Sequence, residues 1–160
     1  MRHILLILII VIGSHSGFSQ NISELESLKI ASKIDDWNKA WETKDAELAC
    51  KWYSENADFT NAFGFNRIGK SEIQKYLTEV FGLDFVMAGN TEQTSIKFKK
   101  ISNNAILVIT TVERRGQKSS DNKDLGIRRT SHYRLFEKTN DWLITAHLIS
   151  DARSIKTEKH

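Results

Sequence analysis

The 160-residue sequence contains no proline and a single cysteine, Cys50. One cysteine excludes a disulfide within the chain, so the fold has to rest on its hydrophobic core. Cys50 stands inside a helical pattern, which favours a packing role over that of a nucleophile. Without proline, the turns depend on glycine, asparagine and aspartate. The sequence also lacks a serine- or glycine-rich linker and an internal repeat, which indicates one globular domain.

Blocks of like charge and motifs for metal or phosphate binding are also missing. Lysine and arginine are interspersed with acidic residues, and the formal net charge is +3. This distribution argues against a nucleic-acid surface or a polybasic membrane patch. The sequence has no His-x-His, no His-Glu-x-x-His, no cysteine pair and no glycine-rich phosphate loop. We therefore expect no metal, no cofactor and no nucleic-acid partner.

The N-terminus has the pattern of a secretory signal peptide. Arg2 precedes an apolar run from Ile4 to Ile12, and small or polar residues follow it. A helix needs about 20 apolar residues to cross a membrane, whereas this shorter run suits a cleaved signal. We expect removal of residues 1–19 and a secreted or periplasmic protein without a membrane partner. An uncleaved anchor is the alternative.

Apolar residues at three- and four-residue steps predict three helices. Ser23 and Glu26 form a capping box at the start of the first helix, while Asp45 caps the second and Ser71 caps the third. The predicted ranges are 23–42, 45–56 and 71–81.

Alternating side chains predict five strands. The first, 58–64, precedes the third helix and places Phe59, Asn61 and Phe63 on one face. The other four strands follow the third helix and are joined by polar turns. Their predicted ranges are 95–101, 105–114, 126–137 and 142–149. Helices followed by antiparallel strands indicate an α+β domain with helices on one face of a single sheet.

A succession of four segments carries a family resemblance. The segments are Trp37–Asp45, Tyr53–Phe59, Arg67–Ile73 and Trp142–Ile144. In this order they resemble SnoaL-like members of the nuclear transport factor 2-like superfamily. The resemblance implies a cone-shaped α+β fold, in which a strongly bent, mainly antiparallel sheet carries three helices on its concave side around a central pocket. The implied domain is 23–151, with a flexible C-terminal tail at 152–160.

The resemblance leaves function open, because the family includes isomerases, dehydratases, cyclases and binding modules without chemistry. In ketosteroid isomerase-like members an aspartate of the first strand is the general base, and Asn61 stands at that position here. An amide cannot take up a proton at neutral pH, so the isomerase mechanism lacks its base. Two roles remain for Asn61: orienting a ligand, or bonding to neighbouring backbone.

His132 is the candidate catalytic acid or base, because the ordinary pKa of histidine, ~6.5, lies near neutrality. Strand alternation places it with Thr130 and Arg134 on one face, opposite Tyr133 and Leu135. Either face is a candidate for the pocket lining.

The last strand is apolar on both faces, which suggests that the convex side of the sheet is covered. Family members commonly pair through that side, so we expect a homodimer with His147 as a candidate for the interface.

Three functions are consistent with these patterns. The first is an exported domain whose apolar pocket binds a small apolar or aromatic molecule without an assigned reaction. The expected ligand-binding residues are Trp37, Tyr53, Phe59, Asn61, Phe63 and Arg134. The second is an enzyme of the polyketide-cyclase, isomerase or dehydratase type that uses His132. The third is a non-catalytic assembly module. The missing strand carboxylate favours binding.

Overall fold

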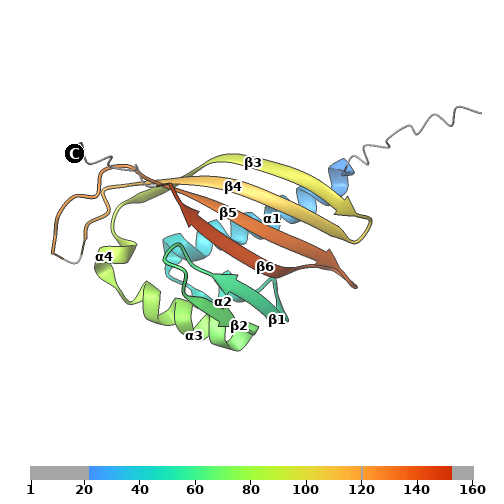
Figure 1. The fold of residues 1–160 in the computed structure, drawn as a ribbon, viewed down its shortest axis with the longest axis horizontal. Helices are drawn as coiled ribbons and strands as arrows, with labels where there is room; N and C mark the ends of the chain where they lie inside the picture. The colour runs from blue at the N-terminus through green and yellow to red at the C-terminus, as the bar shows by residue number, and fades with distance from the viewer. Residues whose placement is uncertain (1–21, 120, 153–160) are drawn as a thin grey trace, which may run out of the picture.

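The computed structural model describes residues 22–119 and 121–152. The predicted signal peptide and nearly all of the predicted tail lie outside these residues. Figure 1 shows the elements, which follow one another as α1 (Glu24–Thr43), α2 (Ala46–Cys50), β1 (Tyr53–Thr60), β2 (Asn66–Ile68), α3 (Lys70–Phe81), α4 (Asp84–Met87), β3 (Asn90–Ser102), β4 (Ala105–Arg115), β5 (Arg128–Lys138) and β6 (Trp142–Asp151). None of the helices in the described part combines the length and apolar character that a bilayer crossing needs.

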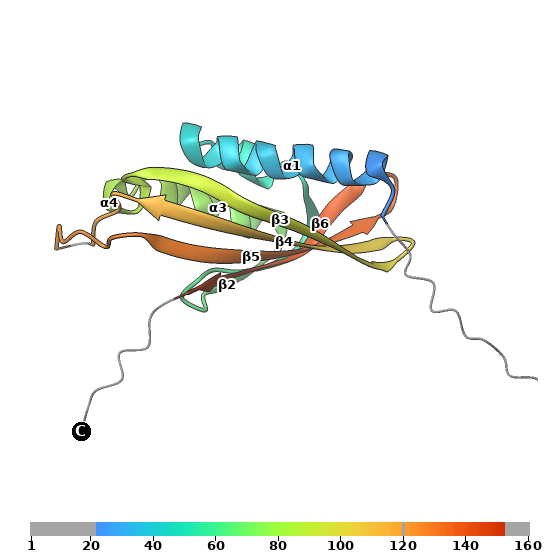
Figure 2. The same cartoon turned by 90° about the horizontal axis from the view of Figure 1, so that it is seen from above.

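The six strands form one bent sheet in the order β2-β1-β6-β5-β4-β3. All neighbouring pairs are antiparallel except β1 and β6, which run parallel. Figure 2 shows α1 lying along one face of this sheet. The predicted fold class, a bent and mainly antiparallel sheet with helices on its concave side, is therefore confirmed, and α4 is a short fourth helix that the sequence pattern did not indicate.

The predicted capping box starts α1. Ser23 Oγ accepts a hydrogen bond from the backbone N–H of Glu26 and donates one to the Glu26 carboxylate. The helix ends at Thr43, and the residue that caps it, Lys44, has a left-handed φ of 57°. Its buried face points toward the sheet and includes Ile30, Ile34 and Trp37. Cys50 at the end of α2 is fully buried, and this burial raises the pKa of its thiol to about 12, as expected for a packing residue.

The predicted second helix is too long, and the first strand was predicted too late in the chain. Asp45 caps α2 as expected, but the helix ends at Cys50 and the chain turns into β1 at Tyr53. Pairing of Tyr53 with Ile144 of β6 outweighs the local helical pattern. Because of this pairing, the side chain of Tyr53 is buried between the sheet and α1.

Two further boundaries differ from the prediction near α3. The segment between the predicted first strand and the predicted third helix includes the short strand β2, which pairs with the end of β1. The N-cap of α3 is Gly69 rather than Ser71, and no side chain caps this helix. Gly69 has a φ of 90°, a conformation that suits glycine because it has no Cβ.

A β-bulge in β6 changes which side chains of that strand face inward. Phe136 of β5 pairs with Ile144 and Leu135 pairs with Ala146, so Thr145 is an extra residue without a partner across the ladder. Strict alternation would place His147 on the face opposite Ile144. The bulge reverses the phase, and both residues are buried on the concave side.

Candidate binding site on the concave face of the sheet

Six buried side chains meet between α1 and the centre of the sheet. We call them the interior cluster; its members are Trp37, Tyr53, Phe59, His132, Arg134 and His147, with exposed fractions between 0% and 6%. The rings pack edge to face, with centroids 5.0 Å apart for Trp37 and His147 and 5.3 Å apart for Phe59 and His147. Helix α1 and strands β1, β5 and β6 therefore each contribute to one compact site.

A chain of hydrogen bonds runs through the interior cluster. The hydroxyl of Tyr53 lies 2.5 Å from His147 Nδ1, and His147 Nε2 lies 3.1 Å from His132 Nδ1. His132 Nδ1 also lies 3.2 Å from Nη2 of Arg134, while its Nε2 lies 3.2 Å from Thr130 Oγ1. The two imidazole rings are thus linked to each other, to a phenol and to a guanidinium.

Arg134 sets the direction of these hydrogen bonds, because a guanidinium can only donate. His132 Nδ1 must accept from Arg134, so its ring proton is on Nε2 and is donated to Thr130. His147 Nε2 then donates to the same Nδ1 of His132, whose one lone pair is shared between Arg134 and His147, and His147 Nδ1 accepts from the hydroxyl of Tyr53. In this arrangement both imidazole rings are neutral and every ring nitrogen has a partner.

Burial holds the cluster in these protonation states. Burial, with the positive charges of Arg134 and Arg128 adding to it, keeps the pKa of His132 well below its usual range. The pKa of His147 is held well below its usual range by burial and by Arg134. Burial raises the pKa of the Tyr53 phenol well above its ordinary value. For Arg134 burial lowers the pKa to about 10, which still leaves it charged at neutral pH.

Arg134 has only neutral partners in the described part of the chain. Its Nη1 donates to Thr110 Oγ1 at 2.9 Å, and its guanidinium carbon lies 5.3 Å from the ring centroid of Trp37. Its Nε is buried and has no hydrogen-bond partner there. The site therefore contains a fully buried cation whose Nε–H has no hydrogen-bond partner among the described residues.

Strand β5 lines the approach to the cluster with polar side chains. We call these four inward-facing residues the β5 stripe; from the partly exposed end to the buried end they are Arg128, Thr130, His132 and Arg134. At the outer end Arg128 pairs with Asp151 at 3.0 Å, bonds to Gln117 at 3.2 Å, and lies 5.4 Å from the ring centroid of Phe63. A line of polar groups thus leads from the surface to Arg134.

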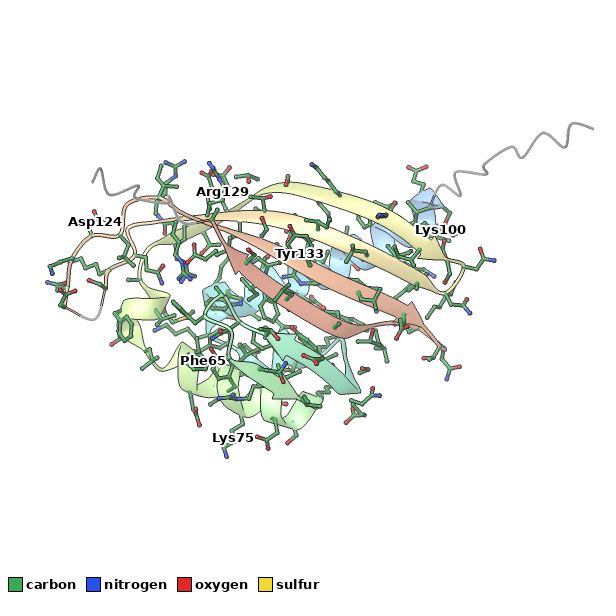
Figure 3. All side chains as sticks on the ribbon, viewed as in Figure 1. Phe65, Lys75, Lys100, Asp124, Arg129 and Tyr133 are labelled. Carbon is green, nitrogen blue, oxygen red and sulfur yellow. The ribbon has the colours of Figure 1, made fainter. Side chains whose placement is uncertain are left out.

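The structure brings together five of the predicted site residues: Trp37, Tyr53, Phe59, His132 and Arg134. It resolves the open question about β5, because His132 and Arg134 face inward while Tyr133 is 38% exposed. Figure 3 shows Tyr133 and Arg129 labelled on the side of the sheet that faces the viewer, with α1 behind it.

Asn61 and Phe63 lie outside the interior cluster because β1 ends at Thr60, so the predicted strand 58–64 is wrong beyond that point. Asn61 Oδ1 accepts from the backbone N–H groups of Phe63 and Phe65, and its amide nitrogen donates to Tyr76. Its hydrogen bonds therefore stabilise the turn, in line with the backbone role considered for it. Phe63 is 60% exposed at the mouth of the β5 stripe.

The sequence patterns missed the role of His147. We expected it at a dimer interface on the convex face, and that placement is wrong, because His147 is 2% exposed and bonds to both Tyr53 and His132. The bulge at Thr145 is the cause, and no residue pattern indicated it. In the described residues no group of three or more histidine, cysteine or acidic side chains is positioned to hold a metal ion.

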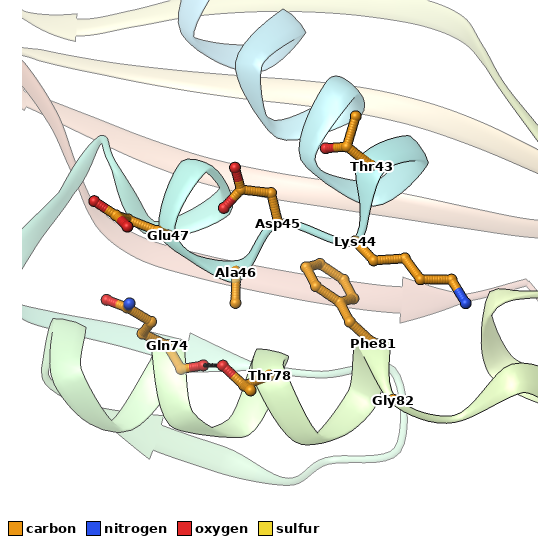
Figure 4. Close-up of a pocket in the computed structure, with 9 residues that line it drawn as sticks. All are labelled: Thr43, Lys44, Asp45, Ala46, Glu47, Gln74, Thr78, Phe81 and Gly82. Carbon is orange, nitrogen blue, oxygen red and sulfur yellow. Dashed lines mark hydrogen bonds between the residues drawn. The ribbon is translucent and has the colours of Figure 1, made fainter.

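A separate hollow lies away from the interior cluster. It has a volume of about 620 Å³ and is open between the end of α1, the start of α2 and one face of α3. Figure 4 shows its lining, which consists of Thr43, Lys44, Asp45, Ala46, Glu47, Gln74, Thr78, Phe81 and Gly82. None of the predicted site residues borders it.

Solved structures of similar shape identify the fold. No protein-family model matches the chain, and no curated protein matches it. An uncharacterised protein with a cystatin-like fold from Caulobacter vibrioides superposes with a TM-score of 0.72 at 15% identity, over 81% of this chain and 91% of the other. A nuclear transport factor 2-like protein from Pseudomonas putida KT2440 gives 0.69 at 13% identity, over 87% and 95%. The chain has the nuclear transport factor 2-like fold.

A third structure, that of a ketosteroid isomerase-like protein from Erwinia carotovora atroseptica, superposes with a TM-score of 0.64 at 14% identity, over 83% of this chain and 100% of the other. Identities this low establish the architecture alone. In this fold the bent sheet and α1 enclose the interior cluster, so function has to be argued from the residues of that site.

The two buried histidines predict a loss of stability in mild acid. Their folded-state pKa values lie below the ordinary 6.5, so the unfolded chain binds more protons as the pH falls below 6.5. Stability is therefore full above pH 6.5 and decreases below it, by up to about 1.4 kcal/mol per pH unit for each histidine. Urea denaturation between pH 7.5 and 5.5 measures this slope. The double variant His132→Gln/His147→Gln should lose most of it, and an unchanged slope would contradict the assignment.

Proposed function

We propose that the protein binds a small molecule with an apolar or aromatic body at the interior cluster, without an assigned reaction. The observation that carries the proposal is the β5 stripe, a line of polar side chains that joins the surface to a buried group of aromatic rings. Natural cores rarely bury a histidine pair and an arginine beside aromatic rings unless the polar groups serve a site.

The composition of the cluster supports an aromatic ligand body. The ring centroids of Trp37, Tyr53 and Phe59 lie within 6.5 Å of one another. Aromatic rings grouped in this way pack well against a flat apolar molecule. Phe63, at the outer end of the β5 stripe, is placed to contact the same molecule on its way in. The proposal includes export, which rests on the N-terminal pattern, and the SnoaL-like subtype, which rests on the four sequence segments.

Native mass spectrometry tests the proposal directly. Protein purified without denaturation should carry a retained small molecule, which denaturing extraction then releases for identification. Thr130→Phe places a ring within the β5 stripe and should abolish retention, because it blocks the path to the cluster. Ser131→Phe adds the same ring to the opposite face of the strand and should leave retention unchanged. Wild-type protein that is consistently empty would favour the assembly-module alternative.

A second candidate function, an enzyme that uses His132 as acid or base, is favoured by the hydrogen-bonded series from Tyr53 through His147 to His132. In the tautomer that Arg134 sets, the Nε2–H of His132 points toward Thr130 and the β5 stripe, so His132 can donate a proton to a molecule bound there and regain one from His147 through Nδ1. If the retained molecule is turned over, His132→Gln should abolish turnover and leave binding within about threefold, since glutamine keeps hydrogen bonding but cannot pass a proton on. Turnover that survives this substitution would exclude His132 as the catalytic group.

The convex face of the sheet supports the proposal of a homodimer. Five apolar side chains lie next to one another across β4, β5 and β6, and we call them the convex patch: Leu107, Ile109, Tyr133, Leu135 and Leu148. Tyr133 and Leu148 are 38% and 48% exposed in the single chain. Exposed apolar residues that form a contiguous patch mark an interaction surface more often than isolated ones do.

Light scattering after size-exclusion chromatography should give twice the chain mass at micromolar concentration. Leu148→Lys introduces a charge into the convex patch and should shift the protein to monomer without lowering its melting temperature. Leu28→Lys makes the same change on the outer face of α1, where the leucine is 61% exposed, and should leave the dimer intact. A monomeric wild-type protein would remove the dimer proposal.

A further inference from the structure

Lys33 and Arg134 are both buried cations, but they differ in whether a carboxylate pairs with them. Lys33 is 5% exposed and has a carboxylate partner, because its ammonium lies 2.8 Å from Asp141. Arg134 is 0% exposed, and among residues 22–119 and 121–152 no carboxylate forms an ion pair with it. Buried charges in proteins are generally paired, since an unpaired one carries a desolvation penalty of several kcal/mol.

The surroundings of Arg134 add to its positive charge. Arg128 stands at the outer end of the β5 stripe, and Arg114 packs over Trp41 on the same side of the sheet. Of these three guanidinium groups, only Arg128 has a carboxylate partner in the described residues, namely Asp151. These three guanidinium groups have one carboxylate partner between them in the described residues, so the local potential favours an anion that approaches along the stripe.

We propose that Arg134 is the recognition group for a carboxylate on the ligand, so that the molecule bound in the interior cluster is an aromatic or apolar monocarboxylic acid. This inference rests on the proposed binding function and specifies its ligand class. Arg134 offers a planar fork of N–H groups that matches a carboxylate, and its Nε has no hydrogen-bond partner in the described part of the chain. The apolar part of the acid lies against Trp37 and Phe59.

A single carboxylate fits the charge balance of the site better than a phosphate. One unpaired buried guanidinium is neutralised by one negative charge, whereas a dianion would leave a second charge buried among aromatic rings. His132 lies between Arg134 and Thr130 along the stripe, and its Nδ1 is hydrogen-bonded to Nη2 of the guanidinium fork. Its ring therefore turns aside when the carboxylate binds. Trp37 lies against both His132 and Arg134, so its fluorescence reports this movement.

The inference also predicts the stability of the ligand-free protein. A residue kept for binding rather than for folding is dispensable for stability, and apolar replacement of a buried ion is often neutral or stabilising. Arg134→Met should therefore keep or raise the melting temperature. A large drop would assign Arg134 a structural role and overturn the inference. Circular dichroism melts of this variant come first, because they also show that it is folded for the binding measurements.

Isothermal titration calorimetry with matched probes then tests the ligand class. Phenylacetate carries the charge, phenylacetamide is its neutral isostere, and inorganic phosphate tests for general anion binding. Phenylacetate should bind the wild-type protein at least about 30-fold more tightly than the amide, since loss of one partner of a buried charge pair costs that much or more. Arg134→Met should abolish the difference. Arg129→Met removes an exposed arginine of the same strand, paired with Glu113, and should preserve it.

The outcomes separate this inference from the function on which it rests. Equal binding of phenylacetate and phenylacetamide, unchanged in Arg134→Met, overturns the role of Arg134 and leaves the aromatic site standing. Tighter binding of phosphate than of phenylacetate overturns the carboxylate assignment alone. Failure of both phenyl probes to bind or to change the tryptophan fluorescence counts against the binding site itself and against the inference with it.

Discussion

The interior of this protein is organised by the buried guanidinium of Arg134, which has no carboxylate partner within residues 22–119 and 121–152. Because Arg134 can only donate, it determines which nitrogen of His132 accepts, and through that ring it sets the tautomer of His147 and the direction of the Tyr53 hydroxyl. Three strands, β1, β5 and β6, supply these groups. A polar network of this kind orients its members more strictly than apolar packing does, since a reversed ring would leave a buried donor or acceptor unpaired.

Much of the architecture could be predicted from local sequence. The capping box at Ser23, the spacing on α1 and the alternation in the later strands describe features that depend on neighbouring residues alone. Their succession was sufficient to suggest the fold. The error at Tyr53 has a different origin, because that residue fits the helical pattern before it and leaves the helix only through pairing with a strand some ninety positions later.

The site was predictable only in part, for the same physical reason. Trp37, Phe59, His132 and Arg134 lie on regular elements, so periodicity indicates which of them share a face. His147 was misplaced because its orientation depends on the bulge opposite Leu135 and Phe136 rather than on alternation. The neutral partners of Arg134, such as Thr110 and Trp37, could not be predicted from local sequence patterns, because they lie on elements that are distant along the chain.

The extra residue in β6, Thr145, separates a part of the strand that contributes to core packing from a part that contributes to the interior cluster. Before Thr145 the inward side chains are Trp142 and Ile144, which belong to the hydrophobic core, and after it the first inward side chain is His147 of the interior cluster. A substitution at Trp142 or Ile144 changes the packing of the core, whereas a substitution at His147 changes the buried hydrogen bonds. The scaffold can thus exchange the groups at the proposed binding site while the hydrophobic end of the same strand stays unaltered, which is one way for a single architecture to acquire different specificities.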